Sequence, residues 1–218
     1  ISDLSRFDLR QGRHFVRDLL ARLERKVMQP LDGHAFAMLL VDGMSGREEW
    51  VVSSLASALG DIPLFGGSAG DELRFGRTHV FGEGAFHTDA AILVIVHTRC
   101  PFVLFGTQHF VSTGKKMVVT AADPSARLVT EINGEPAAEE YARLLGIDSA
   151  RLTPMMFASY PVVVRVGGRH YVRSIQKMNP DGSLSFFCAI DEGIVLTIAE
   201  GVDIIDSLEE TMAVVKSQ

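Results

Sequence analysis

The chain has 218 residues, of which 47% are hydrophobic and 22% are charged, so it can bury a sizeable core. Its net charge of −6 argues against a nucleic-acid partner, because such partners are bound mainly by Lys and Arg that neutralise phosphates. The longest apolar runs, residues 35–41 and 90–96, are far shorter than the ~20 residues of a membrane-spanning helix, so no membrane insertion is expected. Two cysteines, Cys100 and Cys188, make no disulfide framework, which favours a reducing, cytoplasmic compartment.

The first predicted element is a helix over residues 8–28, where apolar side chains recur every three or four positions. Asp8 and Gln11 form a capping-box pattern at its start. Unbroken apolarity over residues 35–41 then predicts a strand covered on both faces.

A second helix is predicted over residues 47–59, with a capping-box pattern at Ser45 and Glu48 and a stop at Gly60. A short strand is expected at residues 63–65. Strand, helix and strand in this order are typical of a βαβ unit.

After Gly70 the pattern becomes rich in strands. Helices are expected at residues 137–145 and 203–215, and β-type runs at residues 77–81, 90–96, 102–110, 116–121, 128–132, 162–166, 169–175, 183–189 and 193–199. The fold class is therefore mixed α/β (α+β), with two sheet-containing halves on which helices pack. The halves are expected at residues 1–146 and 155–218, joined through residues 147–154.

Residues 66–70, Gly-Gly-Ser-Ala-Gly, carry the densest special chemistry and allow three interpretations. The pattern matches the nucleophile elbow of a serine hydrolase with Ser68 as nucleophile, but that motif needs a helix after it, and residues 71–76 do not predict one. A glycine turn with positive φ between two strands is the structural interpretation. A ligand rim is the third, in which Gly66 and Gly67 allow close approach while Ser68 and Asp71 supply polar contacts.

The seven histidines are scattered, without the helical spacing of a zinc site, and no Cys-x-x-Cys occurs. No metal site is therefore expected. His109 lies in a strand-like run, where a histidine is usually half-buried and hydrogen-bonded, and Cys100 stands before Pro101.

Several segments together resemble the FIST family, a two-part sensory domain. The resemblance to its N-terminal region rests on residues 63–71, 78–81, 89–94, 118–121 and 129–137, and that to its C-terminal region on residues 171–175, 181–184 and 192–196. It implies an N-like half at residues 1–146 with an incomplete start, and the beginning of a C-like half at residues 155–218 with an incomplete end.

The resemblance implies a bacterial signal-transduction module that senses a small molecule such as an amino acid. It also implies a signalling partner, such as a histidine kinase or a cyclic-dinucleotide enzyme. A subset of the family is similar to haem-binding nitric oxide sensors, which makes haem the implied cofactor, with His109 the first candidate ligand and Cys100 the second.

We therefore predict a binding module rather than an enzyme, and the alternative is a serine hydrolase of α/β type that uses Ser68. The ligand is expected in a crevice between the halves, a favoured place for ligands. Gly66, Gly67, Ser68 and Asp71 are predicted on one wall. Arg173 is predicted to meet an anionic ligand group, because its guanidinium fork suits a carboxylate.

Overall fold

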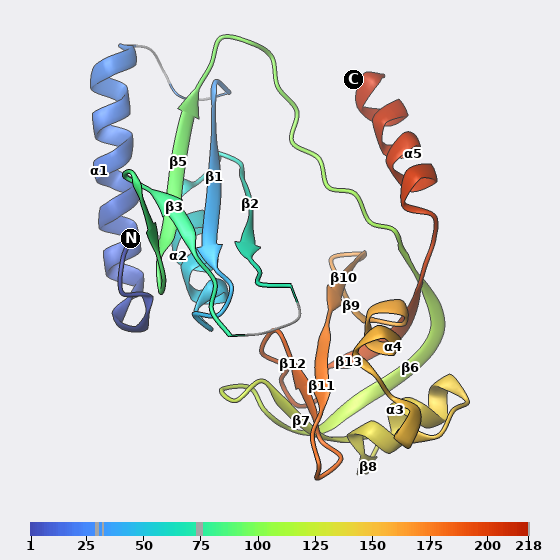
Figure 1. Ribbon diagram of the computed structural model, residues 1–218. Helices are drawn as coiled ribbons and strands as arrows, with labels where there is room; N and C mark the ends of the chain where they lie inside the picture. Colours follow the sequence, from blue (N-terminus) through green and yellow to red (C-terminus); the bar gives the residue numbers. More distant parts are fainter. Residues whose placement is uncertain (29–30, 32, 73–75, 218) are drawn as a thin grey trace. The chain divides into compact units, whose positions relative to one another are not determined.

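The computed structural model describes residues 1–28, 31, 33–72 and 76–217 (Figure 1). The chain divides into two compact units, which we call unit 1 (Ile1–Leu104) and unit 2 (Phe105–Gln218), and each is described by itself. The fold is mixed α+β, as the sequence predicts. In the described part of the chain, no helix is both long and apolar enough to cross a membrane.

Two long helices follow the short 3-10 helix η1 (Leu4–Arg6) in unit 1. Helix α1 (Leu9–Val27) begins with the predicted capping box, in which the Gln11 amide donates to Asp8 Oδ1 at 2.7 Å. Helix α2 (Glu48–Leu59) has Arg47 as N-cap, so the capping box predicted there is wrong; the Ser45 hydroxyl instead accepts a bond from the Arg47 amide at 3.3 Å.

The main sheet of unit 1 has the order β2 (Leu64–Ala69), β1 (Ala35–Asp42), β5 (Ala91–His97). Strands β1 and β2 are parallel and joined through α2, while β5 is antiparallel to β1. A hairpin of β3 (Val80–Gly82) and β4 (Ala85–His87) lies between β2 and β5 in the sequence. Helices α1 and α2 cover one face of the sheet, and the core between them holds Val16, Leu39, Val41, Val51, Leu55 and Leu93.

The predicted glycine turn at Gly66, Gly67 and Gly70 is wrong, because residues Leu64–Ala69 form strand β2. Gly66 allows the two strands to approach, since a Cβ there would lie 1.8 Å from the Leu39 carbonyl oxygen. A Cβ on Gly67 would meet no atom within 4 Å. This glycine-rich segment is a strand because it pairs in parallel with β1. The local sequence does not reveal that pairing.

Unit 2 is built on one antiparallel sheet. In spatial order its strands are β10-β9-β13-β6-β7-β12-β11, and β8 pairs with β7. Their bounds are β6 (Phe110–Asp123), β7 (Leu128–Ile132), β8 (Glu135–Pro136), β9 (Val162–Val166), β10 (Arg169–Arg173), β11 (Ile175–Met178), β12 (Leu184–Phe186) and β13 (Val195–Gly201).

The helices of unit 2 are α3 (Ala137–Leu145), η2 (Ser149–Arg151), α4 (Pro154–Ser159) and α5 (Ile204–Lys216). Helix α3 ends at Gly146, as predicted. Its buried residues join the strands in a core that includes Met117, Val119, Ile132, Tyr141, Leu184 and Leu196.

Two further expectations need comment. The strand predicted at residues 102–110 is wrong, because residues 101–109 join no sheet and β6 begins only at Phe110. The segment 71–76, which does not predict a helix, includes residues 73–75, which lie outside the described residues. The division at residues 147–154 stays a prediction; helices η2 and α4 lie at this point of the chain.

Candidate ligand site

A pocket of about 330 Å³ lies in unit 1 between strand β2 and helix α2. Its apolar walls are Leu39, Val41, Val52, Ala56, Leu64 and Phe65. Glu48, Ser68 and the backbone of Gly66 and Gly67 add polar groups. An apolar cavity with a few polar groups at one side is the usual composition of a small-molecule site.

Strand β2 supplies one wall because of its place in the sheet. It is the edge strand of the described sheet and pairs with β1 alone, with Leu39 opposite Gly66 and Val41 opposite Ser68. Two consecutive glycines leave this part of the wall without side chains. A ligand can therefore come close to the backbone beside Gly66 and Gly67.

Helix α2 supplies the facing wall with a stripe at four-residue spacing: Glu48, Val52 and Ala56. A neighbouring stripe on the same helix, with Val51, Leu55 and Leu59, is buried in the core. Sequence reasoning missed the pocket stripe. The four-residue spacing is visible in the sequence and places these residues on one helix face. Only the fold shows that this face lies against β2.

The buried carboxylate of Asp42 organises the loops at the carboxyl end of β1. Its side chain is 4% exposed and accepts hydrogen bonds from the amides of Met44 at 3.0 Å and Asp89 at 2.6 Å, and from the Thr78 hydroxyl. These donors satisfy a group that would be costly to bury alone. Asp42 follows Val41, which lines the pocket. Its hydrogen bonds therefore hold the segments around Met44, Thr78 and Asp89 next to this end of β1.

The structure brings together three of the five predicted ligand contacts, Gly66, Gly67 and Ser68. Asp71 does not line the pocket; its Oδ2 accepts hydrogen bonds from the amides of Gly76 at 2.6 Å and Arg77 at 3.0 Å. Arg173 ends β10 in unit 2, where its guanidinium donates to the Val172 carbonyl at 3.3 Å. Its role as an anion contact stays a prediction.

Ser68 does not have the geometry of a nucleophile elbow. It lies inside β2, paired in register with β1, and is not among the residues with positive φ. An elbow needs its serine on a sharp, strained turn between strand and helix. Ser68 is thus a residue of a regular strand that lines the pocket.

The haem ligand candidates lie elsewhere. The His109 ring lies against the Phe110 ring at a tilt of 38°, with 4.2 Å between centroids, and Cys100 is exposed. Neither lines the β2–α2 pocket, so this pocket does not fit a haem held by these side chains. Among the described residues, no three or more His, Cys, Asp or Glu side chains are grouped to hold a metal ion.

Comparison with known families agrees with this picture of a binding domain. Residues 3–135 match the FIST N domain, and residues 137–217 match the FIST C domain. No curated protein and no solved structure matches the chain. Because the two domain models together span nearly all of it, the chain belongs to the FIST family, whose domains sense small ligands in signal transduction.

Proposed function

We propose that the pocket between β2 and α2 is the sensing site, and that it binds a small organic molecule with an apolar body and a polar group. The observation that supports this most directly is the composition of the pocket. Its walls are apolar, and the Glu48 carboxylate and Ser68 hydroxyl are its polar side chains. A mostly apolar cavity with a few polar groups at one side favours a ligand that has an apolar body and a polar group able to form hydrogen bonds.

Sensing further requires that the ligand bind two conformations with different affinity. Strand β2 is a suitable responsive element, because within the described sheet it has one neighbouring strand and its other side borders the pocket. Ligand binding then orders β2, and a signalling partner such as a histidine kinase or a cyclic-dinucleotide enzyme reads that change. Slower hydrogen exchange of the β2 amides on ligand addition is the expected signature.

The first experiment is a thermal-shift screen of the twenty amino acids and simple amines, followed by calorimetry on the compound with the largest shift. Ala56→Leu fills the pocket from the α2 wall and is expected to weaken binding at least about tenfold. Ser57→Leu adds the same side chain at an exposed position one residue further, outside the pocket, and is expected to leave affinity unchanged. Equal affinity of the two variants would exclude this pocket.

Two further predictions from the sequence are tested in the same series of experiments. Arg173→Ala tests the predicted anion contact with any carboxylate compound found. Haem is added as a separate compound, and a Soret band that shifts in His109→Ala or Cys100→Ala but not in His170→Ala would assign the ligand. A Soret band that stays at the position of free haem when the protein is added would exclude haem as the ligand.

A further inference from the structure

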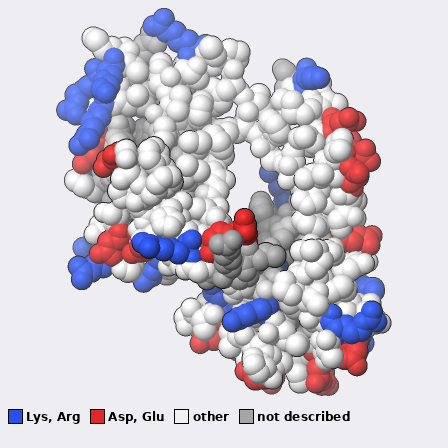
Figure 2. Space-filling model, in the orientation of Figure 1, with Lys and Arg blue, Asp and Glu red and all other residues white. Residues whose placement is uncertain are grey.

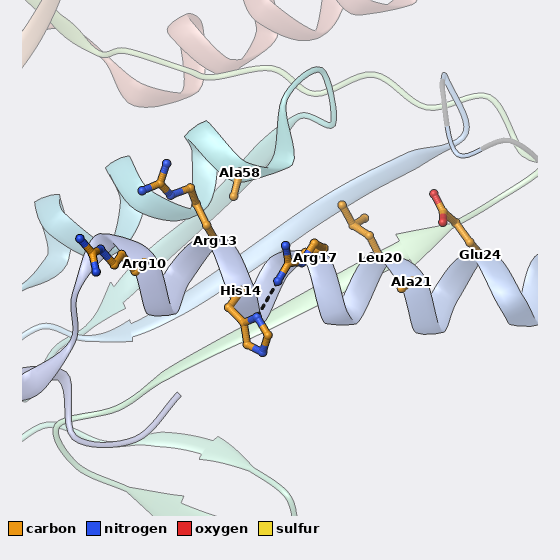
Figure 3. A pocket seen from close by; sticks show the side chains of 8 residues that line it. All are labelled: Arg10, Arg13, His14, Arg17, Leu20, Ala21, Glu24 and Ala58. Carbon is orange, nitrogen blue, oxygen red and sulfur yellow. Dashed lines mark hydrogen bonds between the residues drawn. The ribbon is translucent and has the colours of Figure 1, made fainter.

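A second cavity, of about 830 Å³, lies on the surface of unit 1 between helices α1 and α2. Arg10, Arg13, His14 and Arg17 line the groove from one stretch of α1, Leu20, Ala21 and Glu24 line it further along the same helix, and Ala58 lines it from α2 (Figure 3). Figure 2 shows basic side chains gathered along the outer side of α1. The chain as a whole has a net charge of −6, so this groove differs from it in the sign of its charge.

The groove depends on how the two helices pack. Gly12 brings α1 against α2, since a Cβ there would lie 2.0 Å from Ser54 Oγ. The Ser54 hydroxyl donates to the Leu9 carbonyl at 3.3 Å and ties the helices together. Ala58 lines the groove from α2 with only a methyl side chain. A rigid helix pair therefore carries the groove.

The positive charges of the three arginines in the groove repel one another. Positions three and four residues apart share one helix face, where like charges destabilise the helix. Arg10, Arg13 and Arg17 have this spacing and span about 10 Å along the axis. Among the described residues, Arg10 and Arg13 have no ion-pair partner. A bound anion would offset this repulsion.

Arg17 is held in place by a short relay. Its Nη2 donates to His14 Nδ1 at 2.8 Å (Figure 3). His14 Nε2 lies 3.4 Å from Asp18 Oδ2. With Nδ1 as acceptor, the His14 ring carries its proton on Nε2 and presents it to the carboxylate. The guanidinium therefore loses less side-chain entropy when it meets a ligand.

We propose that this groove binds a nucleoside di- or triphosphate. The arginines contact the phosphates, for which a guanidinium offers a matching fork of donors. Leu20, Ala21 and Ala58 form an apolar seat for the base, and Glu24 at that end accepts a hydrogen bond from an exocyclic amino group. The volume lies within the range of sites for ligands of this size.

The test is calorimetric titration of ADP into the whole chain. The double variant Arg13→Ala with Arg17→Ala is expected to bind ADP at least about tenfold more weakly, because charge-assisted bonds to phosphate are lost. The matched control, Arg22→Ala with Arg25→Ala, removes the same charge from exposed positions of α1 outside the groove and is expected to change affinity less than about twofold. Glu24→Ala is expected to weaken the binding of ADP but not the binding of inorganic diphosphate, which has no base.

A stability measurement separates binding from structure. Without ADP, the Arg13→Ala and Arg17→Ala variant is expected to melt no lower than wild type, because a like-charge repulsion is removed. Absence of ADP binding at millimolar concentration, or equal losses in the two double variants, would overturn the proposal. Binding of poly-glutamate in place of ADP, with the same dependence on Arg13 and Arg17, would assign the groove to an acidic protein segment instead. Because the β2–α2 pocket shares no residue with this groove, failure here leaves the proposed sensing site standing.

Discussion

Unit 1 and unit 2 use their glycines for different purposes. In unit 1, Gly12, Gly43 and Gly66 each stand where an added Cβ would lie less than 3 Å from a neighbouring residue. In unit 2, glycines such as Gly134 and Gly146 have open space around the Cβ position and adopt positive φ. Unit 1 therefore uses glycines both for close approach and, as at Gly46 and Gly60, for positive φ in open space, whereas no described glycine of unit 2 allows such a close approach.

The two units also differ in their pockets and in their spectroscopic probes. Both cavities described above lie in unit 1, beside helices and strands that glycines bring together. The single tryptophan, Trp50, lies on α2 of unit 1, while the three tyrosines, Tyr141, Tyr160 and Tyr171, belong to unit 2. Tryptophan fluorescence and tyrosine near-UV circular dichroism can therefore follow the two units separately.

The largest effect is expected from Gly66→Ala. Its Cβ would lie 1.8 Å from the Leu39 carbonyl oxygen, so β1 and β2 must move apart. We expect a loss of about 3 kcal/mol in the free energy of unfolding of unit 1, followed by Trp50 fluorescence in urea. Gly67→Ala is the control, since nothing lies within 4 Å of its Cβ. Similar losses in the two variants would show that β1 and β2 are not so closely paired.

The next effect belongs to unit 2 and to the buried carboxylate of Glu140, which is 2% exposed. Arg143 donates to it from Nε at 2.5 Å and from Nη2 at 2.7 Å, and Asn133 donates from Nδ2 at 2.7 Å. We expect Glu140→Gln to cost about 2 kcal/mol at neutral pH, because the buried charge-assisted bonds are lost. Glu139→Gln, one residue earlier and exposed, is expected to cost almost nothing.

The same pair of variants has a predictable pH dependence. The hydrogen bonds from Arg143 hold the pKa of Glu140 below its ordinary value of about 4.3. The folded state therefore favours the ionised form, and this stabilisation is present above about pH 4.3 and lost as the pH falls through the lower folded pKa. The stability difference between wild type and Glu140→Gln should shrink in acid, measured by tyrosine circular dichroism in urea. A constant difference would contradict the assignment.

Local patterns predicted part of the molecule well. Helix α1 was predictable because its apolar spacing and its Asp8–Gln11 box are encoded within a few residues. Strand β2 was mistaken for a turn, because what decides its conformation is the distant backbone of Leu39. The opposite error occurred at residues 102–110, where a strand-like sequence finds no strand to pair with.

In the candidate site too, local patterns predicted some residues and tertiary packing determined the others. Gly66, Gly67 and Ser68 were predicted as ligand contacts because glycines and a serine stand together in the sequence. Glu48 and Ala56 were missed, since only tertiary packing turns their helix face toward β2. The arginine groove is similar: the spacing of Arg13 and Arg17 is visible in the sequence, but its partner Ala58 lies on another helix.

The smallest expected effect concerns Tyr141, which is fully buried in unit 2 and donates its hydroxyl to the Tyr160 carbonyl at 2.6 Å. Tyr141→Phe removes one neutral hydrogen bond and is expected to cost about 1 kcal/mol. Tyr171→Phe is the matched control, because Tyr171 is 46% exposed.

Alkaline pH gives this last comparison a second readout. Burial raises the pKa of Tyr141 above its ordinary value of about 10. The stabilisation from its neutral form is therefore fully present below about pH 10 and is lost as the pH rises through the folded pKa, because the unfolded state ionises first. Wild type and Tyr171→Phe should lose stability together above pH ~10, while Tyr141→Phe loses less. An equal loss of stability in all three proteins would mean that Tyr141 ionises as easily in the folded state as in the unfolded chain. It would contradict the burial of Tyr141, which lies on α3 with its ring 5.7 Å from that of Phe157 on α4.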